Sequence, residues 1–473
     1  MNRDDLCYEP TVSLARRIRA GEVSPSEAVT AYLERIERVD PRVHSYLHVA
    51  ADHALRAARR AEQALAAGRE LGALHGVPVA VKDLFDTAGM PTTCGSPRIF
   101  GGNVPTRTAT AVERLEQAGA VLLGKLHMTE FAFITHHPDT RPAVNPWAAD
   151  RSPGGSSSGS AVAAASGLAS ATLGSDTAAS IRLPAAWCGA VGLKPTWGRV
   201  SRDGVFPLAA SFDHVGPIAR SVADAALVLH CIAGPDPRDP STRRQGAPPA
   251  APPPPRDNFK RVRIGWDEDY VTMGVMPEVV AAVRAARDRM EALGATIVPI
   301  ALPDLEATST TFTDVFDVEM RAAHAALYPE RAADYGPLTR HALAHFSTRD
   351  PLVHVEGAIG ARAFRQRIDQ LFDEIDVLLC PVSQLTASPQ VGDAIITEIF
   401  AKDHRNIIRF TRLTSFWDLA ATPAISLPWG FAGDGLPLAV QLVTRVGTDE
   451  ALLSIAARLE AEAPDRGRRP PLE

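Results

Sequence analysis

The sequence predicts an α/β fold with a largely buried sheet. Between residues 71 and 235, short apolar runs alternate with segments of helical pattern, which is typical of layered helices and strands. With 473 residues, of which 45% are hydrophobic, the chain is long enough to bury a sizeable core. Strands are expected at 77–81, 120–123 and 169–173, and helices at 109–118 and 222–233.

Residues 1–70 precede this core, and 11–69 are expected to be helical. Ser24, Pro25 and Glu27 are typical of a helix start, with Ser24 as N-cap, a proline in the first position and a glutamate that completes a capping box. A second helix, rich in alanine and arginine, is expected at about 49–68. We expect these helices to pack on the outside of the core.

A proline-rich polar segment at 236–258 interrupts the pattern, and we expect it to be a surface loop without a regular element. Residues 259–473 are expected to continue the same fold. Strands are expected at 261–269, 295–300 and 422–430, the last of these being the final buried strand, and helices at 277–293, throughout 301–410, at 410–421 and at 450–463. The tail at 464–473 is expected to be frayed.

Charge and cysteine content limit the partners of the chain. The formal net charge of −6 gives no electrostatic reason to expect nucleic acid or an anionic membrane. The histidines lack the spacing of zinc ligands, the N-terminus has no apolar signal segment, and no run of 18 apolar residues occurs. The scattered cysteines form no CxxC motif, which favours reduced thiols in the cytoplasm; they are Cys7, Cys94, Cys188, Cys231 and Cys380.

The segment 151–196 carries the residues best suited to chemistry. It reads RSPGGSSSGSAVAAASGLASATLGSDTAASIRLPAAWCGAVGLKPT. Ser156 follows two glycines and precedes a short helix expected at 160–167. Ser180 closes a tight turn, 174–179, where a serine can present its hydroxyl and neighbouring backbone N–H groups to one point, as acyl transfer requires.

A serine hydroxyl needs a partner that accepts its proton, and Lys82 is a candidate. It ends the apolar run 77–81, and burial lowers the pKa of a lysine because the charged form is disfavoured. Such a lysine can act as a general base near neutral pH. Position alone favours an alternative to the role of base, in which Lys82 reaches solvent or pairs with Asp83 or Asp86. A Ser-His-Asp hydrolase is not indicated, because GSSSG at 155–159 lacks the strand–turn–helix context of a nucleophile elbow.

Residues 154–196 closely resemble the signature of the amidase signature family of serine hydrolases. Further segments from 75 to 443 are similar to the family, among them HGVPVAVKD at 75–83, GKLHMTEFAF at 124–133, SFDHVGP at 211–217 and LPLAVQLV at 436–443. The resemblance implies a central mixed β-sheet covered by helices on both faces, and one domain that spans 1–473.

The resemblance also implies a Ser–cisSer–Lys triad. Ser180 would be the nucleophile, Ser156 the bridging serine 24 positions before it, and Lys82 the base. A cis peptide bond is implied between Gly155 and Ser156. The triad needs no histidine and is one of the Ser–Lys variants of the serine hydrolase triad.

The turn before the nucleophile departs from the family pattern. Members usually have Gly-Gly where this chain has Ala178 and Ala179, and an alanine would be strained if either position required a positive φ. The backbone N–H groups from Thr177 to Ser180 would still hold the oxyanion, while the two methyl groups would narrow the floor of the acyl pocket. Asp176 and Arg182 are expected to anchor the turn through charge-assisted hydrogen bonds.

The resemblance implies a hydrolase that cleaves C–N bonds of small amides, aryl amides or carbamates without a cofactor or metal. Helices within 301–410 would cover the site and select the substrate. Met128 and His127 would line the substrate channel, although helical spacing alone fits a core position equally well. Two alternatives stay open: the A subunit of a tRNA-dependent amidotransferase, whose relatives keep the Gly-Gly pair, and a noncatalytic binding protein of the same fold. A homodimer is compatible with each of them.

Overall fold

The computed structural model describes residues 3–69, 71–244, 246, 251–390, 398 and 400–472. Its centre is a mixed sheet of eleven strands in the order β1-β3-β2-β4-β6-β5-β10-β11-β9-β7-β8. The strands are β1 (Tyr46–Val49), β2 (Pro78–Lys82), β3 (Val121–Leu126), β4 (Ala171–Asp176), β5 (Val191–Lys194), β6 (His214–Ala219), β7 (Arg263–Trp266), β8 (Thr296–Pro299), β9 (Val377–Pro381), β10 (Ala424–Phe431) and β11 (Pro437–Val443). The sheet contains strands from both sides of the proline-rich segment.

Parallel and antiparallel pairs divide this sheet into regions. β2 is parallel to both β3 and β4, and β7 is parallel to β8 and β9. The pairs in between, from β4–β6 through β5–β10 to β11–β9, are antiparallel. The strands β2, β3 and β4, which are joined by parallel pairing, are buried along their whole length, which agrees with the mostly apolar sequences of β2 and β3.

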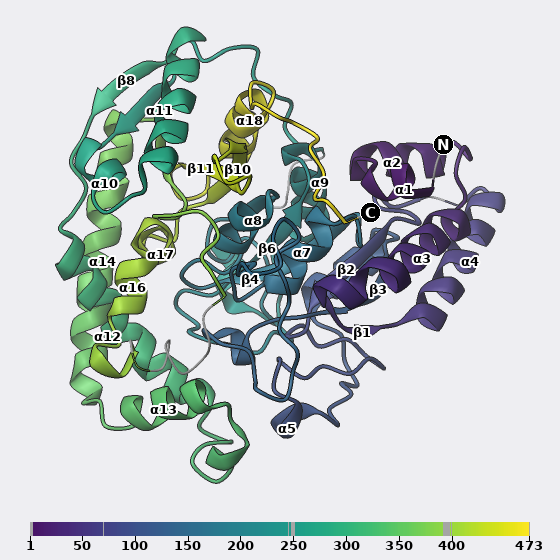
Figure 1. Cartoon of the computed structure of the whole chain (residues 1–473), viewed down its shortest axis with the longest axis horizontal. Coiled ribbons are helices and arrows are strands. Elements are labelled where there is room, and N and C mark those ends of the chain that lie inside the picture. The colour runs from purple at the N-terminus through teal and green to yellow at the C-terminus, as the bar shows by residue number, and fades with distance from the viewer. Residues whose placement is uncertain are drawn as a thin grey trace.

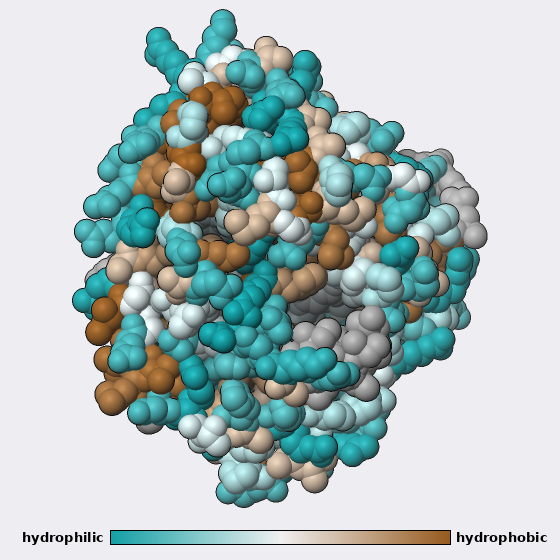
Figure 2. Space-filling model, turned by 60° about the vertical axis from the view of Figure 1, so that its left-hand side comes forward, coloured by the Kyte–Doolittle hydropathy of each residue, from teal (hydrophilic) through white to brown (hydrophobic). Residues whose placement is uncertain are grey.

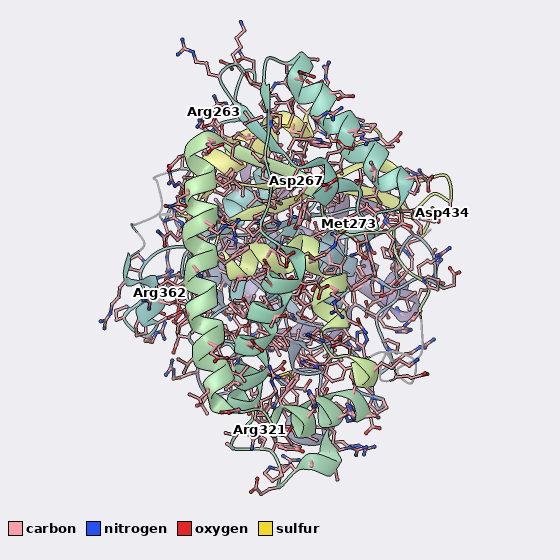
Figure 3. The ribbon with its side chains drawn as sticks, turned by 90° about the vertical axis from the view of Figure 1, so that its left-hand side faces the viewer. Arg263, Asp267, Met273, Arg321, Arg362 and Asp434 are labelled. Atoms are coloured by element: carbon pink, nitrogen blue, oxygen red, sulfur yellow. The ribbon has the colours of Figure 1, made fainter. Side chains whose placement is uncertain are left out.

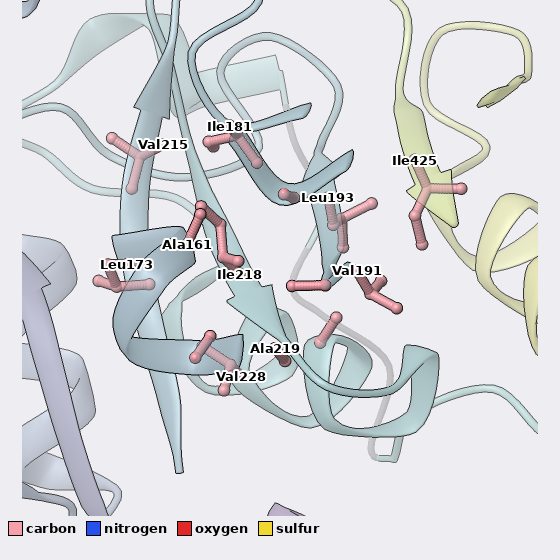
Figure 4. Close-up of a cluster of buried hydrophobic side chains, with 14 of the residues drawn as sticks. Ala161, Leu173, Ile181, Val191, Leu193, Val215, Ile218, Ala219, Val228 and Ile425 are labelled. Atoms are coloured by element: carbon pink, nitrogen blue, oxygen red, sulfur yellow. The ribbon is translucent and has the colours of Figure 1, made fainter. Parts of the chain in front are cut away.

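Helices cover both faces of the sheet (Figure 1). They are α1 (Arg3–Tyr8), α2 (Thr11–Arg19), α3 (Pro25–Val43), α4 (Ala51–Ala66), α5 (Pro97–Phe100), α6 (Thr110–Gln117), α7 (Ser158–Ala165), α8 (Arg182–Cys188), α9 (Val222–Ile232), α10 (Glu268–Thr272), α11 (Pro277–Ala292), α12 (Leu305–Ala323), α13 (Pro337–Phe346), α14 (Pro351–Glu374), α16 (Asn406–Phe410), α17 (Arg412–Leu419) and α18 (Asp449–Glu460). The N-terminal helices lie at one end of the molecule, and α12, α13 and α14 lie at the other (Figure 1). In the core, side chains of β4, β5, β6 and β10 meet Ala161 of α7 and Val228 of α9 (Figure 4).

Most elements expected from the sequence are confirmed within a few residues. Ser24 caps α3: its side chain accepts from the Glu27 N–H, and the Glu27 carboxylate accepts from the Ser24 N–H. The expectation that 11–69 and 301–410 contain only helices is wrong. β1 lies within 11–69, where it pairs with β3, and β9 lies within 301–410, where it pairs with β11 and β7. Both are short strands whose partners are distant in sequence, so helical patterning on either side hides them.

The prediction of a tight turn at 174–179 is also partly wrong. β4 continues through Gly174, Ser175 and Asp176, because Asp176 pairs with His214 of β6 at the far end of the ladder. The turn that remains is therefore shorter, at 177–181. Within 236–258 a short 3-10 helix, Pro240–Arg244, is present where no regular element was expected; 245 and 247–250 lie outside the described residues, as do 391–397 and 399 of the covering region.

The C-terminal expectations need two corrections. β10 is not the final buried strand, since β11 follows it as a hairpin partner. The tail is not frayed through 472, because Arg468 stacks on Phe431 with 4.1 Å from its guanidinium carbon to the ring centroid, and Arg469 stacks on Tyr8. The side chain of Leu472 is buried, and its carbonyl accepts from Arg42 at 2.9 Å. These contacts hold the end of the chain against the N-terminal helices.

Candidate active site

Lys82 is buried at the end of β2, between the parallel neighbours β3 and β4. Its side chain is 0% exposed, and its Nζ donates to Ser156 Oγ at 2.6 Å and to Ser175 Oγ at 2.9 Å. Burial lowers the pKa of Lys82 to about 7, against a smaller opposing effect of the carboxylates of Asp176 and Asp213. A substantial fraction of the amine is therefore neutral at physiological pH.

The alternative arrangement of Lys82 is not found. Lys82 does not reach solvent, and Asp83 faces Lys125 instead, with 3.3 Å between Asp83 Oδ1 and Lys125 Nζ. The other oxygen of Asp83 accepts from the backbone N–H of Thr93 at 2.8 Å. The two neighbouring charges at 82 and 83 thus point into different networks, as alternating strand side chains do.

Ser156 stands at the entry to α7, where the backbone is tightly constrained. The Gly155–Ser156 peptide bond is cis, as the family resemblance implied. Gly154 has a φ of 76°, and a Cβ there would lie 2.9 Å from the Cα of Pro184, so that only glycine fits. Ser157 joins the segments that carry Ser156 and Ser180, because its N–H donates to the carbonyl of Ser180 at 3.1 Å.

The turn that carries Ser180 is held by a buried ion pair at its base. Asp176 Oδ2 accepts from the backbone N–H groups of Ile181 and Arg182 and, at 2.9 Å, from Arg182 Nε. Burial would raise the pKa of Asp176, but the Arg182 guanidinium outweighs it and holds this pKa below the usual value. Arg182 also pairs with Asp418 and donates to Gln441 Oε1, so that the turn is tied to α17 and β11. The anchoring role expected for this pair is confirmed.

The turn leaves backbone donors available beside Ser180. Within the described part of the chain, no hydrogen bond uses the N–H of Ala178, Ala179 or Ser180, whereas the hydroxyl of Thr177 donates to Asp213 at 2.6 Å. Neither alanine has a positive φ, so the backbone strain considered above does not arise. Ser180 is partly exposed, and no hydrogen bond in the described structure joins its hydroxyl to that of Ser156. The arrangement suits an anion that approaches the turn from outside.

The surroundings of the turn are of two kinds. Ala179 is buried in an apolar cluster with Leu183, Ala186, Trp187, Val382, Ala387, Leu436 and Ala439. A cavity of about 270 Å³ reaches Ser175, which contacts Lys82, and is also lined by Ala132, Val205, Phe206, Leu208 and Asp213.

Met128 is fully buried in the main core, with Gly95 as a near neighbour of its side chain, and His127 is buried with it. Their lining of a substrate channel stays a prediction.

Ser175 is the residue that sequence reasoning missed. The turn expected at 174–179 concealed it, because a turn gives no information about which side chains share a face. As part of β4, Ser175 follows Leu173 by two positions, and β4 lies directly beside β2. A strand assignment that extended to Asp176 would have placed a third hydroxyl beside the lysine.

No group of three or more His, Cys, Asp or Glu side chains among the residues that the structure describes is arranged to hold a metal ion. No helix in the same residues is long and apolar enough to cross a membrane. All five cysteines, each within the described ranges, are free.

Comparison with known proteins gives one consistent family. A family model described as Amidase matches residues 27–453. The A subunit of the glutamyl-tRNA(Gln) amidotransferase of Anaeromyxobacter sp. (strain K) is 40% identical over 97% of both chains. A putative amidase, AmiD, of Mycobacterium tuberculosis is 37% identical over 100% of this chain and 98% of its own. Among solved structures, 6-aminohexanoate cyclic dimer hydrolase in complex with its substrate is similar with a TM-score of 0.86 and 27% identity, over 98% and 99% of the two chains.

Proposed function

Since this chain belongs to the amidase family, we propose that it hydrolyses the C–N bond of small, uncharged amides through an acyl-enzyme on Ser180. The observation that carries the proposal is the 2.6 Å hydrogen bond between a fully buried Lys82 and the hydroxyl of Ser156. A lysine with a pKa near 7 is suited to accept a proton at the pH where its partner serine must give one up.

The proposed reaction has two half-reactions. Neutral Lys82 accepts the proton of Ser156, which accepts the proton of Ser180 as its Oγ bonds to the substrate carbonyl carbon. The tetrahedral oxyanion is stabilised by the free N–H groups of the turn, each of which can contribute about 3 kcal/mol in the transition state. The C–N bond then breaks while the relay returns the proton to the leaving amine. Water attacks the acyl-enzyme by the same route and releases the acid and free Ser180.

The charges around the cavity favour an uncharged substrate. Arg202 pairs with Asp239 at 3.6 Å, and Arg238 pairs with Asp203 at 3.4 Å, so these four charges compensate one another. The rest of the lining is mostly apolar or aromatic, apart from Ser175, His214 and Asp213, whose carboxylate accepts from the Thr177 hydroxyl. Aryl amides and carbamates are therefore the preferred substrates in this proposal, as an apolar pocket with few polar groups suits them.

One alternative function is favoured by a specific observation. The 40% identity to an amidotransferase component supports a glutaminase that works within a complex. Two observations oppose it. Alanines stand at 178 and 179, where the family resemblance implies a glycine pair, and both arginines of the cavity are paired with aspartates, which leaves no unpaired cation there for the carboxylate of glutamine. The five free thiols, in turn, fit a reducing compartment such as the cytoplasm.

The test is the activity of the purified chain alone on simple anilides, aryl carbamates and glutamine. We expect hydrolysis of the first two and none of glutamine. Ser180→Ala should lower kcat by at least about a thousandfold with an unchanged unfolding midpoint. Glutamine hydrolysis that needs added partner subunits would support the amidotransferase, and absence of any turnover with retained ligand binding would support a noncatalytic protein.

A further inference from the structure

Asp213 lies opposite the first residue of the turn that carries Ser180. The antiparallel register of β4 and β6 pairs Asp176, at the end of one strand, with His214, at the start of the other. One step beyond this pair, the hydroxyl of Thr177 donates to Asp213 Oδ1 at 2.6 Å. Asp213 thus fixes the first side chain of the turn from the start of the neighbouring strand.

The same carboxylate also holds a wall of the cavity. Asp213 Oδ1 accepts from the N–H of Ala209 at 3.1 Å, and Oδ2 accepts from the N–H of Leu208 at 3.0 Å. Leu208 and Asp213 both line the cavity that reaches Ser175. The hydroxyl and the two N–H groups all donate to this carboxylate, which suits its ionised form. Asp213 therefore connects the cavity wall to the turn.

Two carboxylates hold the ends of the turn without using its inner donors. Asp176 accepts from the N–H groups of Ile181 and Arg182 at the far end. Asp213 holds the near end through a side-chain hydroxyl. Within the described residues, the N–H groups of 178–180 have no hydrogen-bond partner. Donors stabilise a developing oxyanion best when they are fixed before the reaction, so the two anchors preorganise donors that stay free.

We propose that Asp213 is a positioning residue for amide hydrolysis, which holds Thr177 so that the N–H groups of the turn converge beside Ser180. This inference rests on the proposed acyl-enzyme mechanism. Asp213 takes no part in the proton relay, because in the described structure its carboxylate accepts from Thr177 and from backbone N–H groups and not from Lys82. Its contribution is to orient the donors that the oxyanion uses.

A second effect of Asp213 is electrostatic and gives a readout that a merely structural residue would not change. Burial lowers the pKa of Lys82, and the carboxylates of Asp176 and Asp213 oppose that effect. The thiol of Cys94 also acts on Lys82, but burial raises the pKa of this thiol well above its usual value, so it stays uncharged. Burial raises the pKa of Asp213 itself, and the charge of Arg202 opposes that rise. Removing the charge of Asp213 should therefore lower the pKa of Lys82 further.

The test of the contact is anilide hydrolysis by two variants of Thr177. Thr177→Val keeps the shape of the side chain and removes the donor, so kcat should fall by about tenfold while KM changes by less than about twofold. Thr177→Ser keeps the hydroxyl and should recover at least about a third of the wild-type kcat. The control Thr11→Val removes a buried hydroxyl elsewhere in the fold, which donates to the carbonyl of Ser170 at 3.0 Å, and should leave kcat unchanged.

The test of the charge is the pH profile of Asp213→Asn. The amide keeps the shape but is uncharged, so the rise of kcat/KM with pH should move down by at least about half a pH unit. Asp434, whose side chain is 44% exposed at the edge of the molecule, provides the matched control (Figure 3). The surface on this side of the molecule is mostly hydrophilic, and water screens its charges (Figure 2). Asp434→Asn should therefore not move the rise.

Turnover by the wild type separates this inference from the proposed function. A wild type that hydrolyses no amide would overturn the proposed function, and this inference with it. If the wild type is active, full kcat in Thr177→Val, or Thr177→Ser as slow as Thr177→Val, would overturn the positioning role alone. An unmoved rise in Asp213→Asn would show that its charge does not act on Lys82. Urea unfolding checks each fold, and Thr177→Ala takes the place of Thr177→Val if that variant does not fold.

Discussion

The pH dependence of turnover tests the role of Lys82 most directly. Only the neutral amine can accept a proton, so kcat/KM should rise with pH and level off above the pKa of about 7. Activity at pH 6 should be about one tenth of the plateau, and at pH 5 about one hundredth. At its ordinary pKa of 10.5, only about 0.03% of this lysine would be neutral at pH 7, so burial increases the active fraction there by roughly a thousandfold.

Lys82→Arg is the matched perturbation. It keeps a cationic donor at the end of β2 but stays protonated at all accessible pH values, so no proton can be accepted. We expect the variant to lose turnover by at least about a thousandfold from pH 5 to 9. Lys82→Met removes the titrating group and serves as the reference variant for a second measurement, the stability of the protein as a function of pH.

The stability of the protein should change with pH in a defined direction. Between pH 7 and 10.5 the unfolded state holds a proton on Lys82 that the folded state has released, so the free energy of unfolding rises with pH. Relative to Lys82→Met, the wild type should gain about 2 kcal/mol from pH 7 to pH 9. The assay is anilide hydrolysis at constant ionic strength, with urea unfolding of all variants. A flat kcat/KM between pH 6 and 9, or substantial activity of Lys82→Arg, would refute the reasoning.

Three further predictions concern the support of the site and the fold. Ser175→Ala removes the second acceptor of Lys82 Nζ, so kcat should fall by about tenfold with little change in KM, as measured by steady-state kinetics. Arg182→Met leaves Asp176 and Asp418 buried without their cation and should cost about 3–5 kcal/mol in urea unfolding, whereas the same change at the exposed Arg98 should leave the midpoint unchanged. Removal of residues 468–473 should cost about 2 kcal/mol, since it deletes three cation–π contacts and the burial of Leu472. An unchanged midpoint would show that these contacts contribute nothing.

Much of the fold could be predicted because its signals are local. The capping box of α3, the apolar runs of β2 and β3 and the pattern of α9 each depend on a few adjacent residues. β1 and β9 could not be predicted, because each is stabilised by strands distant in sequence. The docked tail was missed for a related reason. Arginines near a chain end indicate exposure to solvent, and only the folded structure places Phe431 against Arg468 and Tyr8 against Arg469.

The candidate site likewise contains residues that could be predicted from the sequence and residues that could not. The resemblance identified Lys82, Ser156 and Ser180, and the structure brings Lys82 and Ser156 into contact. The residues themselves could not decide whether Lys82 is buried, because that depends on β3 and β4 lying on either side of it. Ser175 was hidden by the assignment of a turn.

The order of the strands has a consequence for synthesis of the protein. β5 pairs with β6 on one side, but its other neighbour is β10, which begins about 230 residues later. At translation rates of 5–20 residues per second, the outer edge of β5 remains open for roughly 10–50 seconds while the nascent chain emerges. An open edge of this kind can recruit a strand from another chain. Molecular chaperones that shield this edge until the second half arrives should therefore raise the yield of native protein.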